Sequence, residues 1–420
     1  MNSASRLTRS PSYKWIVAAM AFFAVFAAIG FGRFAYSGLL PSMQKSLGLS
    51  DTATGALASW NLVGYMVMSL VGGLLAARFG ARAIVTIGLL ITALGLFLTG
   101  LSGSLTTAAA ARFLTGMGNG MVMVPAIALM AAWFDARQRG LGTGIVPAGG
   151  PLALVLLGPL VPRILGTNGV DHWRFAWYLL AGITAIIGVV ALVVLRDRPH
   201  EETPRAQPKK TGFADFKFIL SSRSAWHLGF VYFLGGFAML IFITFFQKRL
   251  TADLGYSTAA AGNLFLVVGA AGVAAGVIWG GISDRVGRGK ALAVNLVMQA
   301  VAAAIFSMWT TTPTLIIASL LYGISTWSLP SLIGAQCGDI FGATLASASL
   351  GFTFVFAGAG ETLGPLVGGS MEQHFSSLGP SLALSSGLFF LAGVAALGLR
   401  DVRRGSKEDV CALDSTLAAD

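Results

Sequence analysis

The chain has 420 residues, of which 55% are hydrophobic and only 11% are charged. A soluble protein carries roughly 25% charged residues and has no interior that could hide so much apolar surface, so this composition excludes one. The net charge of +11 does not indicate nucleic-acid binding, because the basic residues gather in alternate loops between apolar segments.

Twelve apolar segments follow one another along the chain, each long enough to cross a bilayer as a helix of about 20 residues. The first is too long for the core of a secretory signal, so we expect it to be a membrane helix. The sequence thus predicts an all-α integral membrane protein. Its predicted spans are residues 15–40, 54–77, 83–102, 107–133, 140–162, 174–195, 225–247, 258–282, 290–309, 313–336, 345–369 and 380–399.

A polar, proline-containing stretch divides these spans into two groups of six. We expect an N-terminal bundle over residues 1–195, a cytoplasmic linker over 196–224, a C-terminal bundle over 225–399 and a cytoplasmic tail over 400–420. Within the linker, the amphipathic pattern of residues 213–220 is compatible with a short helix on the membrane surface and equally with a plain tether.

The two groups of spans repeat each other. Their matching positions are 207 residues apart and include the pairs Gly73/Gly280, Leu47/Leu254 and Phe134/Phe341. A register held across half the molecule indicates a tandem duplication.

The distribution of basic residues predicts the orientation in the membrane. With both termini in the cytoplasm, 21 of the 28 Lys and Arg residues fall in cytoplasmic segments, as the positive-inside rule requires. We therefore expect a monomeric, multi-pass protein of the bacterial cytoplasmic (inner) membrane, surrounded by lipid and without a nucleic-acid partner.

The loop after the eighth span reads Gly280-x-x-x-Asp284-Arg285-x-Gly287-Arg288 and resembles the signature loop of the major facilitator superfamily. With the twelve spans and the duplication, the resemblance covers nearly the whole chain. It implies two pseudo-symmetric six-helix bundles around one central site, lined by helices 1, 4, 7 and 10, that open to each side of the membrane in turn.

An acid beside arginines at a helix end can hold a neighbouring helix end, so this loop predicts a gate contact. The alternative is a charged turn that only fixes topology. Ala77 stands where the acid is expected in the first-half copy of the loop, which leaves the gate role of that copy open. The predicted gating residues are Asp284, Arg285, Arg288, Arg78 and Asp339, with Asp339 expected to pair with Arg285 or Arg288, and Asp135 with Arg78.

Charged side chains inside a span are costly and usually face a cavity. Arg33 in span 1, with Tyr36 on the same face, predicts a cation that binds an anionic group; a structural charge paired within the bundle is the alternative. Glu361 is the only carboxylate deep within a span. A desolvated carboxylate can take up a proton near neutral pH, so Glu361 is either a proton carrier or a lock between helices.

Span 4 contains Arg112-x-x-x-Gly116-x-Gly118, which is similar to the family's fourth-helix motif. That resemblance links Arg112 to proton handling, whereas snorkelling to the membrane surface is the alternative. The expected proton-coupling residues are therefore Glu361 and Arg112. The expected substrate-binding residues are Arg33, Tyr36, Arg112, Asn119, Tyr322, Tyr232, Asn61 and Tyr65, with helix packing as the alternative for the uncharged ones.

Span 11 carries a glycine series with Gly364-Pro365 that looks like the family's motif linked to drug–proton antiporters. In those proteins the motif lies on span 5. We therefore expect a bendable, closely packed helix here and draw no conclusion about export.

These features predict a secondary active transporter that moves a small anionic organic solute by alternating access, coupled to protons or by exchange. The sequence offers no ATP-binding loop, metal cluster or catalytic set, so we expect neither an enzyme nor a cofactor. We expect the proton motive force to supply the energy for transport. The family's carboxylate carriers often place an Arg on helix 8, which this chain lacks before Asp284. Two alternatives stay open: a proton-driven multidrug efflux antiporter, and a membrane receptor or sensor that transports nothing.

Overall fold

A computed structural model describes residues 13–49, 51–135, 137–165, 172–197 and 213–399, and these ranges are helical without a strand. The expected tail, 400–420, and residues 198–212 of the expected linker lie outside the described residues. The elements in chain order are α2 (Tyr13–Val25), the π-helix η1 (Phe26–Phe34), α3 (Ala35–Leu47), α4 (Asp51–Phe79), α5 (Ala81–Leu101), α6 (Leu105–Trp133), α7 (Arg139–Ile145), the 3-10 turn η2 (Val146–Ala148), α8 (Gly149–Leu165), α9 (Trp173–Val194), α10 (Phe213–Ser221), α11 (Arg223–Lys248), the π-helix η3 (Arg249–Asp253), α12 (Thr258–Val286), α13 (Arg288–Met308), α14 (Thr312–Thr326), α15 (Leu329–Phe375) and α16 (Gly379–Leu397).

Twelve helices of the described part are long and apolar enough to cross a membrane, which confirms the predicted fold class. Span 5 is built from α7, η2 and α8, and span 10 from α14 and the first part of α15. Within α15 the chain bends at Gly342, where φ is 70°. Only glycine adopts this left-handed conformation without strain, so a single residue separates spans 10 and 11.

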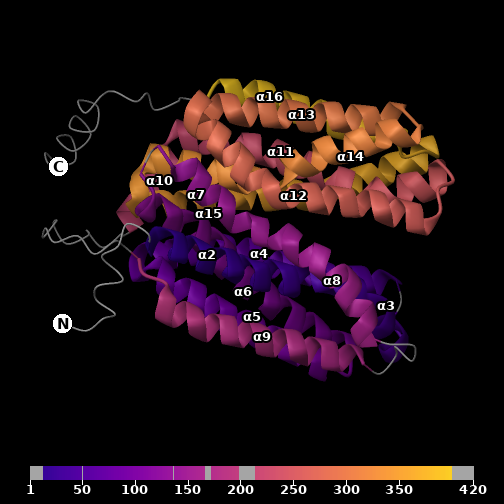
Figure 1. Cartoon of the computed structure of the whole chain (residues 1–420), viewed down its shortest axis with the longest axis horizontal. Helices are drawn as coiled ribbons and strands as arrows, with labels where there is room; N and C mark the ends of the chain where they lie inside the picture. Colours follow the sequence, from indigo (N-terminus) through magenta and orange to yellow (C-terminus); the bar gives the residue numbers. More distant parts are fainter. Residues whose placement is uncertain (1–12, 50, 136, 166–171, 198–212, 400–420) are drawn as a thin grey trace, which may run out of the picture.

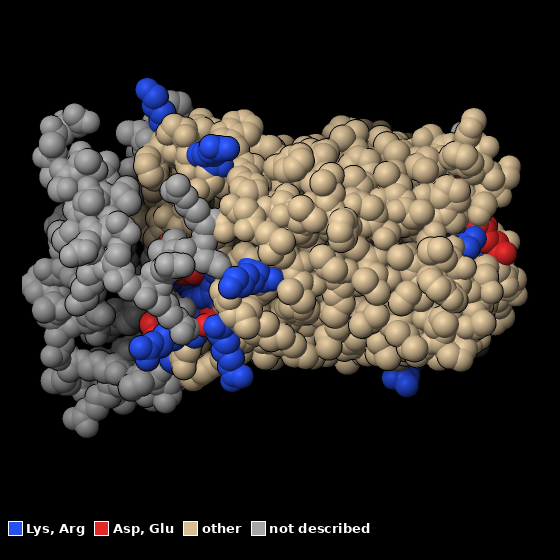
Figure 2. Space-filling model, turned by 90° about the horizontal axis from the view of Figure 1, so that it is seen from above, with Lys and Arg blue, Asp and Glu red and all other residues tan. Residues whose placement is uncertain are grey.

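The spans form two bundles that lie side by side (Figure 1), α2–α9 in indigo to magenta and α11–α16 in rose to yellow. On the face drawn in Figure 2, most lysine and arginine side chains lie near one end, and the long band between the ends carries almost no charge. A wide uncharged band is what contact with lipid tails demands, because a charge there has no water to solvate it.

The two bundles touch through a pair of glycine crossings at the end of the molecule where α6 and α12 end and α7 begins, which we call the latch end. A methyl group on Gly280 of α12 would overlap the carbonyl oxygen of Gly140 on α7. A methyl group on Gly73 of α4 would likewise meet the carbonyl oxygen of Ser347 on α15. The two contacts are repeat equivalents, each residue lying 207 positions from its counterpart. The duplication seen in the sequence is therefore a pseudo-symmetry of the interface.

The glycine series of span 11 packs α15 against α11. A methyl group on Gly360 would overlap the carbonyl oxygen of Phe233, and one on Gly364 would lie 2.5 Å from that of Phe237. Close backbone approach of this kind is how helices associate where lipid gives no hydrophobic drive. The motif marks a tightly packed helix, as expected.

The amphipathic segment of the linker is a helix, α10, and it packs on protein. Its residue Ile219 is fully buried in an apolar cluster with Phe341 and Phe352 of α15. Leu74 of α4 packs against the same cluster, so the helix reaches the seam between the two bundles. Of the two alternatives for this segment, a helix and a tether, the structure has the helix.

Candidate functional site

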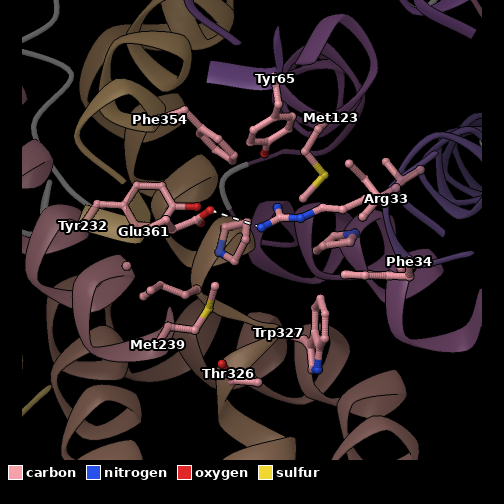
Figure 3. A pocket seen from close by; sticks show the side chains of 17 residues that line it. Arg33, Phe34, Tyr65, Met123, Tyr232, Met239, Thr326, Trp327, Phe354 and Glu361 are labelled. Atoms are coloured by element: carbon pink, nitrogen blue, oxygen red, sulfur yellow. Dashed lines mark hydrogen bonds and ion pairs between the residues drawn. The ribbon is translucent and has the colours of Figure 1, made fainter. Parts of the chain in front are cut away.

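A cavity lies between the two bundles, with side chains of both halves around it (Figure 3). Its volume is about 60 Å³, small beside the roughly 300–1,000 Å³ of ordinary ligand pockets. The side chains that line it come from both halves: Val25, Ile29, Arg33, Phe34, Tyr65, Met123, Pro147, Gly150, Tyr232, Gly236, Met239, Thr326, Trp327, Leu329, Pro330, Phe354 and Glu361.

An ion pair crosses this cavity from one half to the other. Nη2 of Arg33, near the end of η1, lies 3.4 Å from Oε2 of Glu361 on α15. The two side chains keep 23% and 12% of their surface exposed, so both charges are largely removed from water. The predicted anion-binding cation and the predicted proton carrier thus face each other, and each neutralises the other.

Aromatic rings from both halves surround the ion pair. The guanidinium carbon of Arg33 lies 5.8 Å from the ring centre of Tyr65, within cation–π range. Tyr65 meets Phe354 edge-on at 6.1 Å, and Phe34 meets Trp327 edge-on at 5.4 Å. Each of these ring pairs joins one half to the other, so the aromatic side chains close the cavity where the bundles meet.

The π-helix η1 (Phe26–Phe34) positions Arg33. Two glycines let this wider helix approach its neighbours, because a methyl group on Gly30 would overlap Ala153 of α8 and one on Gly32 would overlap Asn119 of α6. Short π segments in an α-helix often mark functional sites, since the extra residue per turn re-aims the side chains that follow. Nothing in the sequence analysis pointed to this distortion.

The polar stripe of span 4 faces the backbone of span 1. Nη1 of Arg112 donates to the carbonyl oxygen of Gly32 at 2.8 Å, and the side-chain amide of Asn119 donates to that of Ala28 at 2.9 Å. The guanidinium of Arg112 stacks 4.6 Å from the ring of Tyr36. Contrary to the prediction, Arg112, Asn119 and Tyr36 do not line the cavity: the first two bond to backbone oxygens of the π segment, and the Tyr36 ring lies against Arg112.

Two further predicted substrate residues are also packed away from the cavity. Asn61 donates its amide to the carbonyl oxygen of Arg112 at 3.1 Å. Tyr322 is fully buried, stacks on Phe242 at 3.9 Å and donates its hydroxyl to the carbonyl oxygen of Met239 at 3.3 Å. Both form interhelical contacts within one bundle. Of the predicted substrate-binding residues, Arg33, Tyr65 and Tyr232 line the cavity, and Glu361, the predicted proton carrier, lines it too.

Several cavity residues were not singled out from the sequence: Phe34, Met239, Trp327 and Phe354. Their apolar side chains look like ordinary helix packing in a chain that is apolar on every face. One signal was available for Trp327, because Pro330 follows it closely and span 10 is interrupted there between α14 and α15.

At the latch end, Asp284 holds the start of α7 in the other half. Its carboxylate accepts hydrogen bonds from the backbone N–H groups of Gly140 at 2.8 Å and Leu141 at 2.9 Å. A helix start carries unpaired N–H groups and a partial positive charge, which favour a carboxylate. The predicted contact between the loop acid and a neighbouring helix end is present.

Arg288 is the arginine of the loop that joins this contact. Its Nε donates to Asp339 at 2.9 Å, and its Nη1 donates to Ser283 at 2.8 Å and also to Asp284. Asp339 forms a second ion pair with Arg139 of the opposite half. Of the two partners considered for Asp339, the structure selects Arg288, whereas Arg285 is exposed and forms no ion pair with a described residue.

The first-half copy of the loop forms no comparable latch. The guanidinium of Arg78 stacks 5.3 Å from the ring of Phe79, and Asp135 accepts from the backbone of Gln138. No ion pair joins Arg78 to Asp135 among the residues that the structure describes. Their predicted pairing is therefore not observed.

Relatives with similar sequences are transporters by name. A putative tartrate transporter of Agrobacterium vitis is 26% identical over 85% of this chain and 87% of its own length. An agnestins efflux protein of Paecilomyces divaricatus is 26% identical over 89% of this chain and 83% of its own. A hexuronate transporter of Bacillus subtilis is 23% identical over 87% of this chain and 90% of its own.

Solved structures show the same architecture. The proton:xylose symporter XylE, bound to 6-bromo-6-deoxy-D-glucose, superposes with a TM-score of 0.78 over 96% of this chain and 99% of its own, at 16% identity. The sequence profile of the Major Facilitator Superfamily matches residues 21–250 and 242–411. With the twelve spans, the pseudo-symmetric interface and the central cavity, these matches show that the chain belongs to the Major Facilitator Superfamily and is a multi-pass membrane transporter.

Proposed function

We propose that the protein is a secondary transporter that carries a small organic anion together with a proton. One observation carries the proposal: the ion pair between Arg33 and Glu361 that crosses the cavity. A carboxylate substrate is the natural competitor of Glu361 for the guanidinium, because Arg binds carboxylates through two parallel N–H groups.

The two binding events support each other. When a substrate carboxylate pairs with Arg33, Glu361 loses its cation, and an unpaired buried carboxylate is costly. A proton removes that cost by neutralising Glu361. Binding of the anion and binding of the proton therefore favour each other by the same free energy, whichever comes first.

Charge balance then explains why the two move together. The empty site is neutral, with Arg33 and Glu361 paired, and the site loaded with both anion and proton is neutral too. A site with only the anion or only the proton carries a net charge inside the low-dielectric part of the membrane, which costs several kcal/mol. The halves accordingly rearrange when the site is empty or fully loaded, which is the rule of a symporter.

We further propose that the latch end faces the cytoplasm of a bacterial inner membrane. The excess of basic residues in the loops of that end supports this orientation. The structure, with Asp284 bonded to α7, is then the state closed to the cytoplasm.

Efflux of amphipathic compounds is the second candidate, and the aromatic rings of the cavity and the agnestins efflux relative favour it. A cationic compound would pair with Glu361 and so compete with the proton, which gives antiport. The two candidates thus predict proton movement in opposite directions relative to the substrate. A receptor, the third alternative, would bind its ligand without moving it across the membrane.

Transport into proteoliposomes with a pH-sensitive dye inside tests the proposal. Addition of a transported acid should acidify the lumen, and Arg33→Gln should abolish both acid flux and proton flux. Glu361→Gln should still exchange labelled acid for unlabelled acid, because its loaded site is neutral. It should not use a pH gradient to accumulate the acid against the concentration gradient of the acid. Glu372→Gln is the matched control, since Glu372 lies on the same α15 helix as Glu361 but pairs with the exposed Lys248 of α11. Proton-driven accumulation by Glu361→Gln, or proton movement opposite to that of the acid, would overturn the proposal.

A further inference from the structure

We propose that the substrate is a monocarboxylate with an aromatic or otherwise apolar body, and not a dicarboxylate or a sugar acid. This inference rests on the proposed function, because it assumes that the substrate anion binds Arg33. It goes further by naming the chemical class that the rest of the cavity accepts.

The first argument is the number of cations. Arg33 is the only cationic side chain among those that line the cavity, and Glu361 is the only acidic one. The second arginine of the bundle interior, Arg112, is turned away and donates to the carbonyl oxygen of Gly32. A dicarboxylate would therefore place one carboxylate in a desolvated site without a cation, which is strongly unfavourable.

The second argument is the shortage of hydrogen-bonding groups. Beyond the ion pair, the polar side-chain atoms of the lining belong to Tyr65, Tyr232, Thr326 and Trp327. The indole of Trp327 points its nitrogen at α12, where a methyl group on Gly272 would lie 2.7 Å from Nε1. Three hydroxyls remain for a sugar acid whose own hydroxyls each need a partner, and unpaired polar groups in such a site are rejected by large factors.

The third argument is the chemistry of the walls. Tyr65 and Phe354 lie on one side of the Arg33–Glu361 pair and Met239 and Trp327 on the other (Figure 3). Aromatic faces and thioether sulfurs bind aromatic rings through dispersion and quadrupole contacts. A flat carboxylic acid satisfies the whole lining, with its carboxylate at Arg33 and its ring between these walls.

Equilibrium binding to the purified protein is the primary measurement, because neutral aromatic acids cross bilayers unaided and obscure flux. Calorimetric titrations would compare benzoate and phenylacetate with tartrate and galacturonate, and with benzamide as the uncharged shape control. We expect the aromatic acids to bind at least about tenfold more tightly than tartrate or galacturonate, and benzamide not to bind. Arg33→Gln should remove binding of the aromatic acids.

Two matched variants test the aromatic wall. Phe354→Leu should weaken benzoate about two- to tenfold, the range of an aromatic pair. Phe352→Leu, two residues away and packed against Trp226 outside the cavity, should leave it unchanged. Equal losses in both variants, or benzoate binding that survives Arg33→Gln, would overturn the inference.

The outcomes separate this inference from the proposed function. Arg33-dependent binding of tartrate or galacturonate with none of benzoate would overturn the monocarboxylate inference and keep anion transport. If no acid binds while cationic amphiphiles bind through Glu361, the proposed function itself fails and the inference fails with it.

Discussion

The two halves meet at the latch end through two crossings that share close backbone contacts at equivalent positions but differ in their charges. Gly280 crosses Gly140, and Gly73 crosses Ser347, at equivalent positions of the repeat. Further along the same helices, Gly276 crosses Gly144, and Ser69 crosses Gly351 in the equivalent place. The steric part of the gate is therefore duplicated.

Among the residues that the structure describes, the polar part of the gate is present at one crossing only. At the α7–α12 crossing, Asp284 bonds to the start of α7 and Asp339 bridges Arg288 to Arg139 of the other half. At the α4–α15 crossing, Ala77 replaces the acid and lies against the apolar cluster that buries Ile219 of α10. One crossing is held by charge and the other by apolar packing.

This difference separates two roles of the gate. Small residues allow the helices to touch, and at the glycine positions of both crossings an added methyl group would overlap backbone atoms of the partner helix. Charge-assisted hydrogen bonds add a strong, directional contact that is lost once the helices move apart by an ångström or two. We infer that the α7–α12 crossing sets how firmly the latch end closes, while the α4–α15 crossing seals it.

The largest effect is expected from Gly280→Ala. Its methyl group would overlap a backbone oxygen, which cannot swing aside, so the closed state should lose about 3 kcal/mol. Spin labels at the exposed Arg137 and Arg285, one on each half, would report a longer distance. Gly281→Ala is the control, because nothing lies within 4 Å of its added methyl group. Equal distances in the two variants would break the idea of a steric gate.

Asp284→Ala should open the latch end somewhat less. It leaves the N–H groups of Gly140 and Leu141 without their acceptor and removes one of the two acids that contact Arg288. Hydrogen bonds to a charged group contribute about 1.5–3 kcal/mol, so the ratio of closed to open molecules should fall by at least about tenfold. An unchanged distance distribution between the same labels would show that the charges are not part of the gate.

A smaller shift is expected from Arg139→Gln, which removes the ion pair between the halves but leaves Asp339 paired with Arg288. The closed state should lose about 1 kcal/mol, because the pair is partly exposed. Arg82→Gln is the matched control, since Arg82 bonds to the carbonyl oxygen of Leu192 within its own half. A shift of the label distance in the control as large as in Arg139→Gln would remove the distinction between the two crossings.

The sequence was sufficient to predict the twelve spans and the repeat, for a physical reason. Lipid requires continuous apolar helices. The register of 207 residues reappears as two equivalent contacts, of Gly280 with Gly140 and of Gly73 with Ser347. The contact of Asp284 could be predicted too, because a carboxylate beside arginines at a helix end can hold a neighbouring helix end.

The cavity could be predicted only in part. In a membrane helix the lipid face and the interior face are both apolar, so periodicity does not tell which polar residue faces the substrate. Arg33 and Tyr36 were expected on one face, yet the helix changes from π to α between them, and Tyr36 turns to Arg112. Arg112 and Asn119 were likewise expected in the cavity, but they bind backbone oxygens of the distorted span 1. No residue pattern in span 1 predicts that distortion.

The smallest effect is expected from Ala77→Asp, which restores the family's loop pattern in the first half and so tests whether the pattern alone makes a latch. The new carboxylate would face the apolar cluster of Ile219, Phe341 and Leu74. It should therefore lower the free energy of unfolding by about 1 kcal/mol, the lower end of the cost of an unpaired polar group, without stabilising the closed state. Thermal melting and the label distance would be measured together. A shorter or narrower distance distribution than in the parent protein would mean that a second charge latch can form there, and that the α4–α15 crossing lacks one only because the acid was lost.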